Sequence, residues 1–322
     1  MAKIESASAI STPKWLLAST LIFLFLRCGL AAYENYNPPQ ASDEIHWRSP
    51  EKITEEDRLG RKLFFYNFSA DWCDPCKKLD KTAFVSKDIV GLLERDFIPV
   101  RVIDRKKESG KNDSDTQELQ DKYSVQAFPT LVAAMPGGVK ISEHIGSLNM
   151  AALKKMLLEA NAVADYFWGK EELIDGRFAA AANSFDSFLK HTRWHHWRAA
   201  FAGVFSVLAH RELGEEAASK KALKDALEHL HDPAFPRPIL LYFDSKISYD
   251  ELLKIAGENK SNRILCYAYT GLDFAREKDY ERARKNFEWV LSNSVDKDSF
   301  EYRICSKALG RIESAKQSPP GS

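Results

Sequence analysis

The sequence predicts two folded parts, an α/β layer domain followed by an all-α domain of helical repeats. Between residues 61 and 160, stretches typical of strands alternate with stretches typical of helices, which implies an α/β layer fold. From residue 161 to residue 313 strand signals nearly vanish and helical periodicity takes over. The chain has 322 residues, and single hydrophobic cores usually stop growing before this size, so two domains are expected.

The charge balance argues against one class of partner. The chain carries 46 basic and 46 acidic side chains, so its formal net charge is zero, and no dense basic block stands out. Binding to the phosphate backbone needs a basic face, and we therefore expect no nucleic acid as a partner. The hydrophobic content of 44% is that of an ordinary globular protein.

Residues 1–32 predict export. Lys3 and Lys14 precede an apolar run of 12 residues at 15–26, and small residues follow at Ala31 and Ala32. This order is typical of a signal peptide, whereas a membrane-spanning helix needs about 20 apolar residues. We expect cleavage after Ala31 or Ala32; an uncleaved anchor in the inner membrane is the alternative. The bacterial periplasm is the expected compartment.

The elements of the first part can be placed in order along the chain. Residues 33–60 predict a linker and a short helix that Thr54 caps. Strands are expected at 62–68, 97–103, 130–134 and 139–145, with the last two forming a hairpin around Pro136-Gly137-Gly138. Helices are expected at 73–84, 86–95, 116–123 and 150–160, and a charged, solvated loop at 105–115.

The second part contains a repeated pattern of small and aromatic residues. Ala181 follows Gly169 by 12 residues and Phe185 lies four residues further on; the same offsets recur at Gly271, Ala283 and Phe287. Small residues here let two antiparallel helices approach closely, and the aromatic ring fills the gap beside them. A further helix pair is expected at 194–212 and 215–231. The pattern resembles tetratricopeptide repeats, whose unit is a helix pair of about 34 residues. The tail at 314–322 is expected to be disordered.

Five cysteines are too few for a disulfide-stapled scaffold. The spacing C-x2-C occurs once, and a structural zinc site would need two more ligands at suitable spacing, so no metal is expected. Cys266 and Cys305 lie in the helical part, either as inert buried thiols or joined as a disulfide. His195 and His196, between two tryptophans, are adjacent on a helix and point in different directions, which favours packing over metal binding.

Cys73 and Cys76 stand where a predicted strand becomes a helix, and this position predicts redox chemistry. A thiolate attacks a disulfide, and a helix N-terminus lowers the pKa of a cysteine through unpaired N–H groups and the helix dipole. We expect the first sulfur to be exposed and the second to be partly covered. Cys73 is then the nucleophile and Cys76 the resolving cysteine, and the two form a redox-active disulfide.

The run Trp72-Cys73-Asp74-Pro75-Cys76 resembles the active site of the thioredoxin family. The resemblance covers about residues 45–160 and implies a thioredoxin fold. It also implies that Trp72, Asp74 and Pro75 shape the surface that meets the substrate. The likeness is strongest to the C-terminal domain of the electron carrier DsbD and the thioredoxin-like proteins near it.

A second motif supports the resemblance. Gln126-Ala127-Phe128-Pro129-Thr130-Leu131 looks like the cis-proline loop of the family, and a cis bond is expected between Phe128 and Pro129. In the family this loop lies beside the active-site sulfurs, and the backbone before the proline pairs with the substrate chain. Phe128, Pro129 and Thr130 are therefore expected in substrate binding.

Two residues depart from the family pattern. The family usually has a buried carboxylate six residues before the first cysteine, but Asn67 occupies this position and cannot act as a base. Asp80, four residues after Cys76 and on the same helical face, is the remaining candidate for a proton relay. Asp74 places a negative charge between the cysteines, which opposes the thiolate. Together with Pro75, it favours a reductase or isomerase over a strong oxidant.

The sequence therefore predicts an exported thiol–disulfide oxidoreductase, reductase- or isomerase-like, that needs no cofactor. Its partners are expected to be protein thiols or disulfides, a thiol protein that donates or accepts electrons, and a protein bound by the helical repeats. Two alternatives remain open. One is a repeat-based scaffold or assembly factor whose thioredoxin-like domain only docks. The other is copper(I) handling by Cys73 and Cys76, since thiolates suit that ion.

Overall fold

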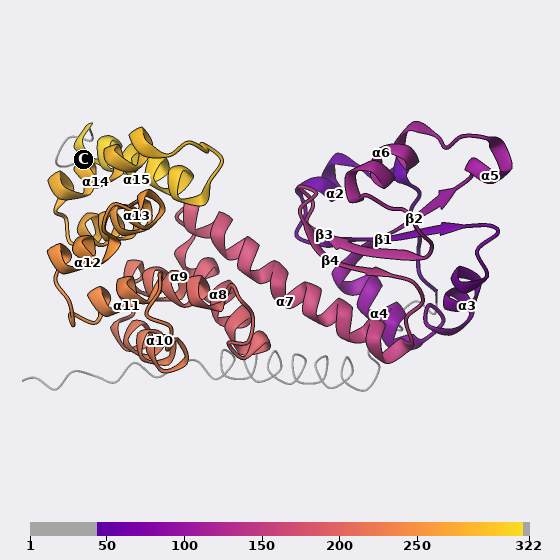
Figure 1. Cartoon of the computed structure of the whole chain (residues 1–322), viewed down its shortest axis with the longest axis horizontal. Helices are drawn as coiled ribbons and strands as arrows, with labels where there is room; N and C mark the ends of the chain where they lie inside the picture. Colours follow the sequence, from indigo (N-terminus) through magenta and orange to yellow (C-terminus); the bar gives the residue numbers. More distant parts are fainter. Residues whose placement is uncertain (1–43, 318–322) are drawn as a thin grey trace, which may run out of the picture.

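The computed structural model describes residues 44–317 and contains an α/β domain and an all-α domain joined by one long helix (Figure 1). This arrangement confirms the predicted fold class. The predicted signal peptide or anchor at 1–32 lies outside the described residues. Within residues 44–317, no helix has the length and apolar character that a membrane span needs.

A four-stranded sheet in the order β2-β1-β3-β4 forms the centre of the α/β domain. Its strands are β1 (Leu63–Ala70), β2 (Phe97–Asp104), β3 (Thr130–Ala134) and β4 (Lys140–Ile145). β1 pairs in parallel with β2 and antiparallel with β3, which in turn pairs antiparallel with β4. Because β1 is central and covered on both faces, nearly all of its residues are buried and most of them are apolar.

Helices cover both faces of the sheet. On one face lie α3 (Asp74–Thr82), α4 (Lys87–Asp96) and the first part of α7 (Met150–Ile174), where Leu79, Leu93 and Leu157 belong to the same core as Phe65. On the other face, Tyr123 of α6 (Ser114–Tyr123) packs against Phe68. The arrows of β1 and β2 point to the end of the domain that lies away from the all-α domain (Figure 1).

The segment before β1 is part of the domain. A 3-10 helix at Pro50–Lys52 and α2 (Glu55–Leu59) precede the strand, and Thr54 caps α2 in a capping box with Asp57. Residues 45–48 fall in the predicted linker, yet Trp47 packs edge-on against Phe84 at 5.0 Å and Arg48 bridges to Val100. Burial of this indole against the core holds the segment on the sheet.

The all-α domain begins within α7, which runs without a break across the predicted domain boundary at residues 160 and 161. Within residues 44–317, eight helices follow it: α8 (Phe178–Thr192), α9 (Ala199–Glu212), α10 (Glu216–His229), α11 (Arg237–Phe243), α12 (Tyr249–Ala256), α13 (Lys260–Arg276), α14 (Tyr280–Asn293) and α15 (Phe300–Gln317). They share one hydrophobic core with the second half of α7.

The glycine–aromatic pattern lies at two helix–helix contacts. A Cβ built on Gly169 of α7 would stand 2.8 Å from the ring of Phe185 of α8, and one on Gly271 of α13 would stand 2.6 Å from the ring of Phe287 of α14. Neither site has room for a methyl group, and Ala181 and Ala283 are completely buried in the same core. The equivalent packing at both sites shows that the two helix pairs repeat one structural unit.

Three predicted elements differ from the structure. The helix expected from residue 194 begins only at Ala199, because Arg193 and Trp194 both have positive φ angles and Trp194 instead stacks on His229 at 5.0 Å. The charged loop at 105–115 contains the short helix α5 (Lys106–Ser109). The tail expected to be disordered from residue 314 is helical as far as Gln317.

Candidate active site

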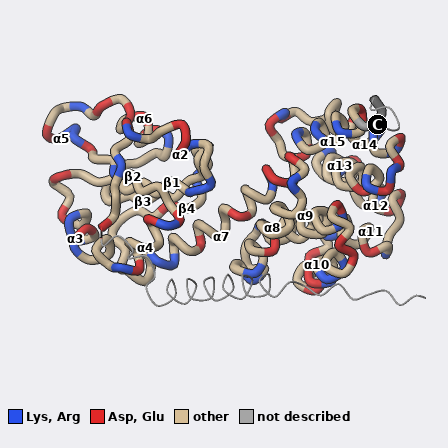
Figure 2. The backbone as a smooth tube through the Cα atoms, turned by 180° about the vertical axis from the view of Figure 1, so that it is seen from behind, with Lys and Arg blue, Asp and Glu red and all other residues tan. Residues whose placement is uncertain are grey.

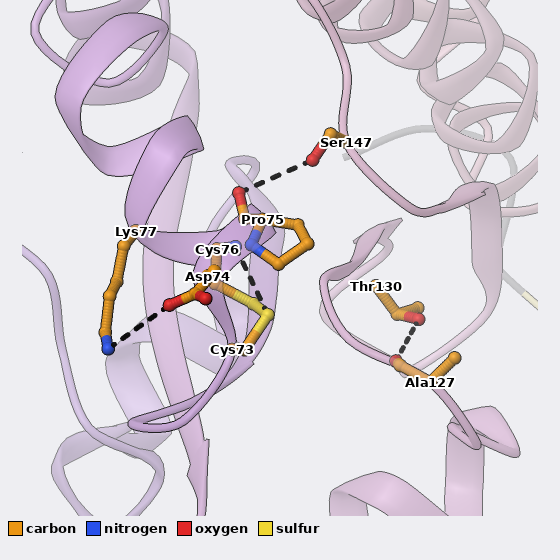
Figure 3. The surroundings of a disulfide bond; sticks show 8 residues. All are labelled: Cys73, Asp74, Pro75, Cys76, Lys77, Ala127, Thr130 and Ser147. Atoms are coloured by element: carbon orange, nitrogen blue, oxygen red, sulfur yellow. Dashed lines mark hydrogen bonds and ion pairs between the residues drawn. A yellow bond between two sulfur atoms is a disulfide. The ribbon is translucent and has the colours of Figure 1, made fainter.

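Cys73 and Cys76 lie where β1 ends and α3 begins, and they form a disulfide with an S–S distance of 2.05 Å (Figure 3). Cys73 is the N-cap of α3, and its sulfur accepts a hydrogen bond from the N–H of Cys76 at 3.2 Å. Pro75 lies in the first turn, where a missing N–H costs no helical hydrogen bond and the fixed φ suits the helix. The local sequence thus builds a tight turn that brings both sulfurs together.

The expectation that the first sulfur is exposed is wrong for this disulfide form. Cys73 is 2% exposed and Cys76 is 3% exposed. Both lie in a small cluster with Ala70, against which the ring of Phe128 packs. Phe128 comes from the loop before β3, far along the chain, and its packing against this cluster contributes to the burial of the two cysteines.

The loop that carries Ala127 and Thr130 lies opposite the cysteines (Figure 3). The Phe128–Pro129 peptide bond is cis. The hydroxyl of Thr130 donates to the carbonyl of Ala127 at 2.8 Å and closes the turn. The N–H of Gly146 donates to the carbonyl of Pro129 at 2.7 Å, which ties the loop to the end of β4.

The remaining predicted substrate-contacting residues form an exposed rim. Trp72 is 46% exposed, and its ring stands edge-on to that of Phe128 with 6.0 Å between centroids. Asp74 is exposed and lies 3.7 Å from the ammonium of Lys77, and the carbonyl of Pro75 accepts a hydrogen bond from Ser147 at 3.4 Å (Figure 3). Trp72, Pro75 and Phe128 therefore surround a disulfide that is itself covered.

Asp80 lies on α3 and forms an ion pair that the sequence analysis missed. Nη2 of Arg101 donates to its Oδ1 at 2.6 Å, and the same guanidinium lies 4.6 Å from the ring centroid of Trp47. Arg101 interrupts an otherwise apolar strand, Phe97-Ile98-Pro99-Val100-Arg101-Val102-Ile103. A lone charge at a half-buried strand position was the signal that could have identified it.

Asn67 lies beside this pair. It is 2% exposed and is the register partner of Arg101 between β1 and β2. Within residues 44–317, neither its Oδ1 nor the Nε of Arg101 has a hydrogen-bond partner, although both atoms are buried. A buried polar atom without a hydrogen-bond partner is costly, so these two atoms are an unfavourable feature of the pairing between β1 and β2.

The other cysteines and histidines of residues 44–317 lie apart from the dithiol. Cys266 and Cys305 are buried free thiols. Burial raises the pKa of Cys266 to about 12 and holds that of Cys305 well above its ordinary value, so both stay protonated. His196 packs against Phe188 and Trp197. Among residues 44–317, no three His, Cys, Asp or Glu side chains are grouped as metal ligands.

Comparison with known proteins adds four findings. A family model described as a thioredoxin-like domain matches residues 50–161. A thioredoxin of Echinococcus granulosus is 31% identical over 107 residues, which are 32% of this chain and 81% of that protein. Protein disulfide-isomerase C17H9.14c of Schizosaccharomyces pombe is 27% identical over 124 residues, 38% of this chain and 32% of that protein, so the match spans about a third of the isomerase. The solved structure of the DsbH oxidoreductase is 23% identical, with 38% of this chain and 88% of that one covered and a TM-score of 0.33.

Proposed function

The chain belongs to the thioredoxin-like family, and we propose that it is an exported thiol–disulfide oxidoreductase that acts on protein disulfides in the bacterial periplasm. One observation carries the chemical part: Cys73 and Cys76 form a disulfide at the N-terminus of a helix, against a loop that contains a cis proline. Export rests on the charge and hydropathy of residues 1–32.

The reaction begins with the reduced form. The Cys73 thiolate attacks one sulfur of a substrate disulfide; an Sγ–S bond forms, the substrate S–S bond breaks, and the leaving sulfur takes the electron pair and a proton. Cys76, once deprotonated, attacks Sγ of Cys73. The second substrate sulfur leaves as a thiolate, which takes up a proton, and Cys73 and Cys76 are left oxidised. Two electrons pass from the dithiol to the substrate, and a dithiol protein restores the reduced form.

The two cysteines have different surroundings, which supports these roles. Cys73 is the N-cap of α3, where the unpaired N–H groups of the first turn stabilise a thiolate. Phe128 and Trp72 border it, so a partner must meet these rings when it reaches the sulfur. Asp74 and Pro75 favour net reduction or isomerisation, because a negative charge beside the sulfur opposes the thiolate that a strong oxidant stabilises.

We assign to Asp80 the transfer of the proton from the Cys76 thiol. Its carboxylate is the acidic group on α3 nearest in sequence to Cys76 on the same helical face, and Arg101 fixes its position. Asn67 cannot take a proton from a thiol, so the role passes to Asp80.

The helical domain is proposed to bind a protein partner. Its repeated helix pairs present extended surfaces of the kind that tetratricopeptide-like arrays use in protein recognition. It lies at the end of the molecule away from the carboxyl ends of β1 and β2, where the dithiol stands (Figure 1). A partner held there must itself be large, or extended, if it is also to reach Cys73.

Reduction of insulin disulfides by dithiothreitol tests the proposal. We expect the wild-type protein to accelerate reduction and Cys73→Ser to abolish the acceleration, with Cys266→Ala, a replacement of a buried thiol in the helical domain, as the matched control. If wild type and Cys73→Ser behave alike while both are folded by circular dichroism, the scaffold function is favoured. Metal analysis of the reduced protein after exposure to copper(I) tests metal handling by the same sulfurs.

A further inference from the structure

Hydrogen bonds hold the segment between β2 and α6 in place, and the segment reaches Trp72 beside the dithiol. Asp104, at the end of β2, is 6% exposed, and its carboxylate accepts hydrogen bonds from Asn112 at 2.8 Å and from Gln120 at 3.0 Å. The Oδ1 of Asn112 accepts from the N–H of Arg105 at 2.7 Å. Burial raises the pKa of Asp104, but these hydrogen bonds outweigh it and lower the pKa below the ordinary value. The carboxylate therefore stays charged and holds both ends of the segment.

The same segment places a cation on the active-site tryptophan. Helix α5 ends at Gly110, whose φ of +75° lets its N–H bond back to the carbonyl of Lys106 at 2.9 Å. The ammonium of Lys107 lies 4.6 Å from the centroid of the Trp72 ring, within the range of a cation–π contact. Since Trp72 in turn meets Phe128, which covers the disulfide, Lys107, Trp72 and Phe128 form one continuous surface.

Residues 105–111 carry more positive than negative charge, and Asp104 just before them interacts with the charge of Lys106. Arg105, Lys106, Lys107 and Lys111 are all exposed, with Glu108 the only acid among residues 105–111. Across residues 44–317, no salt bridge joins any of the four cations to a carboxylate. Figures 1 and 2, from opposite sides, both place α5 at the end of the domain where α3 lies. The excess is confined to residues 105–111, because Asp104 precedes them and Asp113 and Asp115 follow.

We propose that residues 105–111 dock acidic side chains that flank the reactive cysteine of the partner protein, with Lys107 as a specificity-determining residue. The inference rests on the proposed function and names its substrate class: protein disulfides with Asp or Glu nearby. A partner that approaches Cys73 must cross Trp72, and Lys107 is the charged group in contact with that ring. Exposed charges of this kind act mainly on the rate of encounter, and salt weakens them.

Two disulfide peptides that differ only in carrying two Glu or two Lys residues beside the cystine provide the test. The reduced full-length protein is expected to reduce the acidic peptide with a kcat/KM about fivefold higher than the basic one at low ionic strength, and the preference shrinks as salt is added. Lys107→Gln removes most of the preference and Lys107→Glu reverses it, chiefly through KM. Lys254→Glu, the same charge change on α12 in the helical domain, leaves the preference unchanged.

Alkylation of Cys73 by a neutral reagent separates docking from a general effect on the dithiol. We expect Lys107→Glu to alkylate at the wild-type rate, because an uncharged reagent does not sense the docking charge. Equal rates with both peptides in an active wild-type protein, or a Lys107→Glu variant that slows both peptides by one factor, overturn the docking inference alone. Absence of cysteine-dependent reduction of either peptide overturns the proposed function and this inference with it.

Discussion

Arg101 on β2 donates a hydrogen bond to Asp80 on α3 at 2.6 Å, and so fixes the one acidic group that the family resemblance leaves for proton transfer. The pair is about one-third exposed at each side chain. Trp47 covers the guanidinium on another side, and Asn67 lies opposite Arg101 in the register of β1 and β2. The carboxylate thus has a fixed position on the helix that carries both cysteines.

Replacing Asp80 tests whether this carboxylate moves a proton. Asp80→Asn keeps the shape of the side chain but removes its ability to accept a proton. We expect the attack of Cys76 on the mixed disulfide to slow by at least tenfold at neutral pH, while the first attack by Cys73 keeps its rate. Rapid quenching with acid, followed by mass spectrometry, measures both steps. The control is Asp88→Asn on α4, an exposed carboxylate paired with Lys154. An unchanged resolution rate in Asp80→Asn contradicts the relay.

The glycine contacts in the helical domain predict opposite effects of the same substitution. Gly271→Ala drives a methyl group into the ring of Phe287, and we expect the free energy of unfolding to fall by about 1–3 kcal/mol. Gly310→Ala on α15 meets nothing within 4 Å, and we expect a gain of about 0.5–1 kcal/mol from helix propensity. Urea unfolding followed by circular dichroism measures both. A loss of stability in Gly310→Ala, or none in Gly271→Ala, contradicts the packing described here.

The buried thiols predict a loss of stability at high pH. Burial raises the pKa of Cys266 to about 12 from an ordinary value of 9.0, and raises that of Cys305 as well. The folded chain therefore holds these protons while the unfolded chain releases them, so the free energy of unfolding falls as pH rises above about 9. Unfolding curves in urea at a series of pH values measure the slope. The double variant Cys266→Ala/Cys305→Ala should show a shallower slope, and an equal or steeper slope is the contrary result.

The sequence predicted the elements that depend on local patterns. Each of the two site motifs spans only a few residues: the C-x2-C spacing follows one strand, and Phe128-Pro129-Thr130 precedes another. The structure brings the two motifs together. The Gly169 and Gly271 patterns predicted close helix contacts for a similar reason, because helical geometry sets which residues share a face.

The sequence could not predict features that depend on residues far apart in the chain. Phe128 covers Cys73 only because β1 and β3 are neighbours in the sheet. Arg101 reaches Asp80 because folding brings a side chain of β2 to one of α3, 21 residues away in the chain. Lys107 was placed in a solvated loop, and its contact with Trp72 depends on the hydrogen bonds that hold Asp104 and Asn112 together. All three are tertiary contacts, and only Arg101 had a local signal, a single charge within an apolar strand.

Trapping with Cys76→Ser tests the central claim most directly. This variant keeps the nucleophile and lacks the resolving thiol, so a mixed disulfide on Cys73 should persist, and mass spectrometry after non-reducing electrophoresis identifies the attached protein. We expect partners on Cys76→Ser, few on the wild type and none on Cys73→Ser. A folded Cys76→Ser protein that carries no partner on Cys73, or the same partners on Cys73→Ser, would contradict the account.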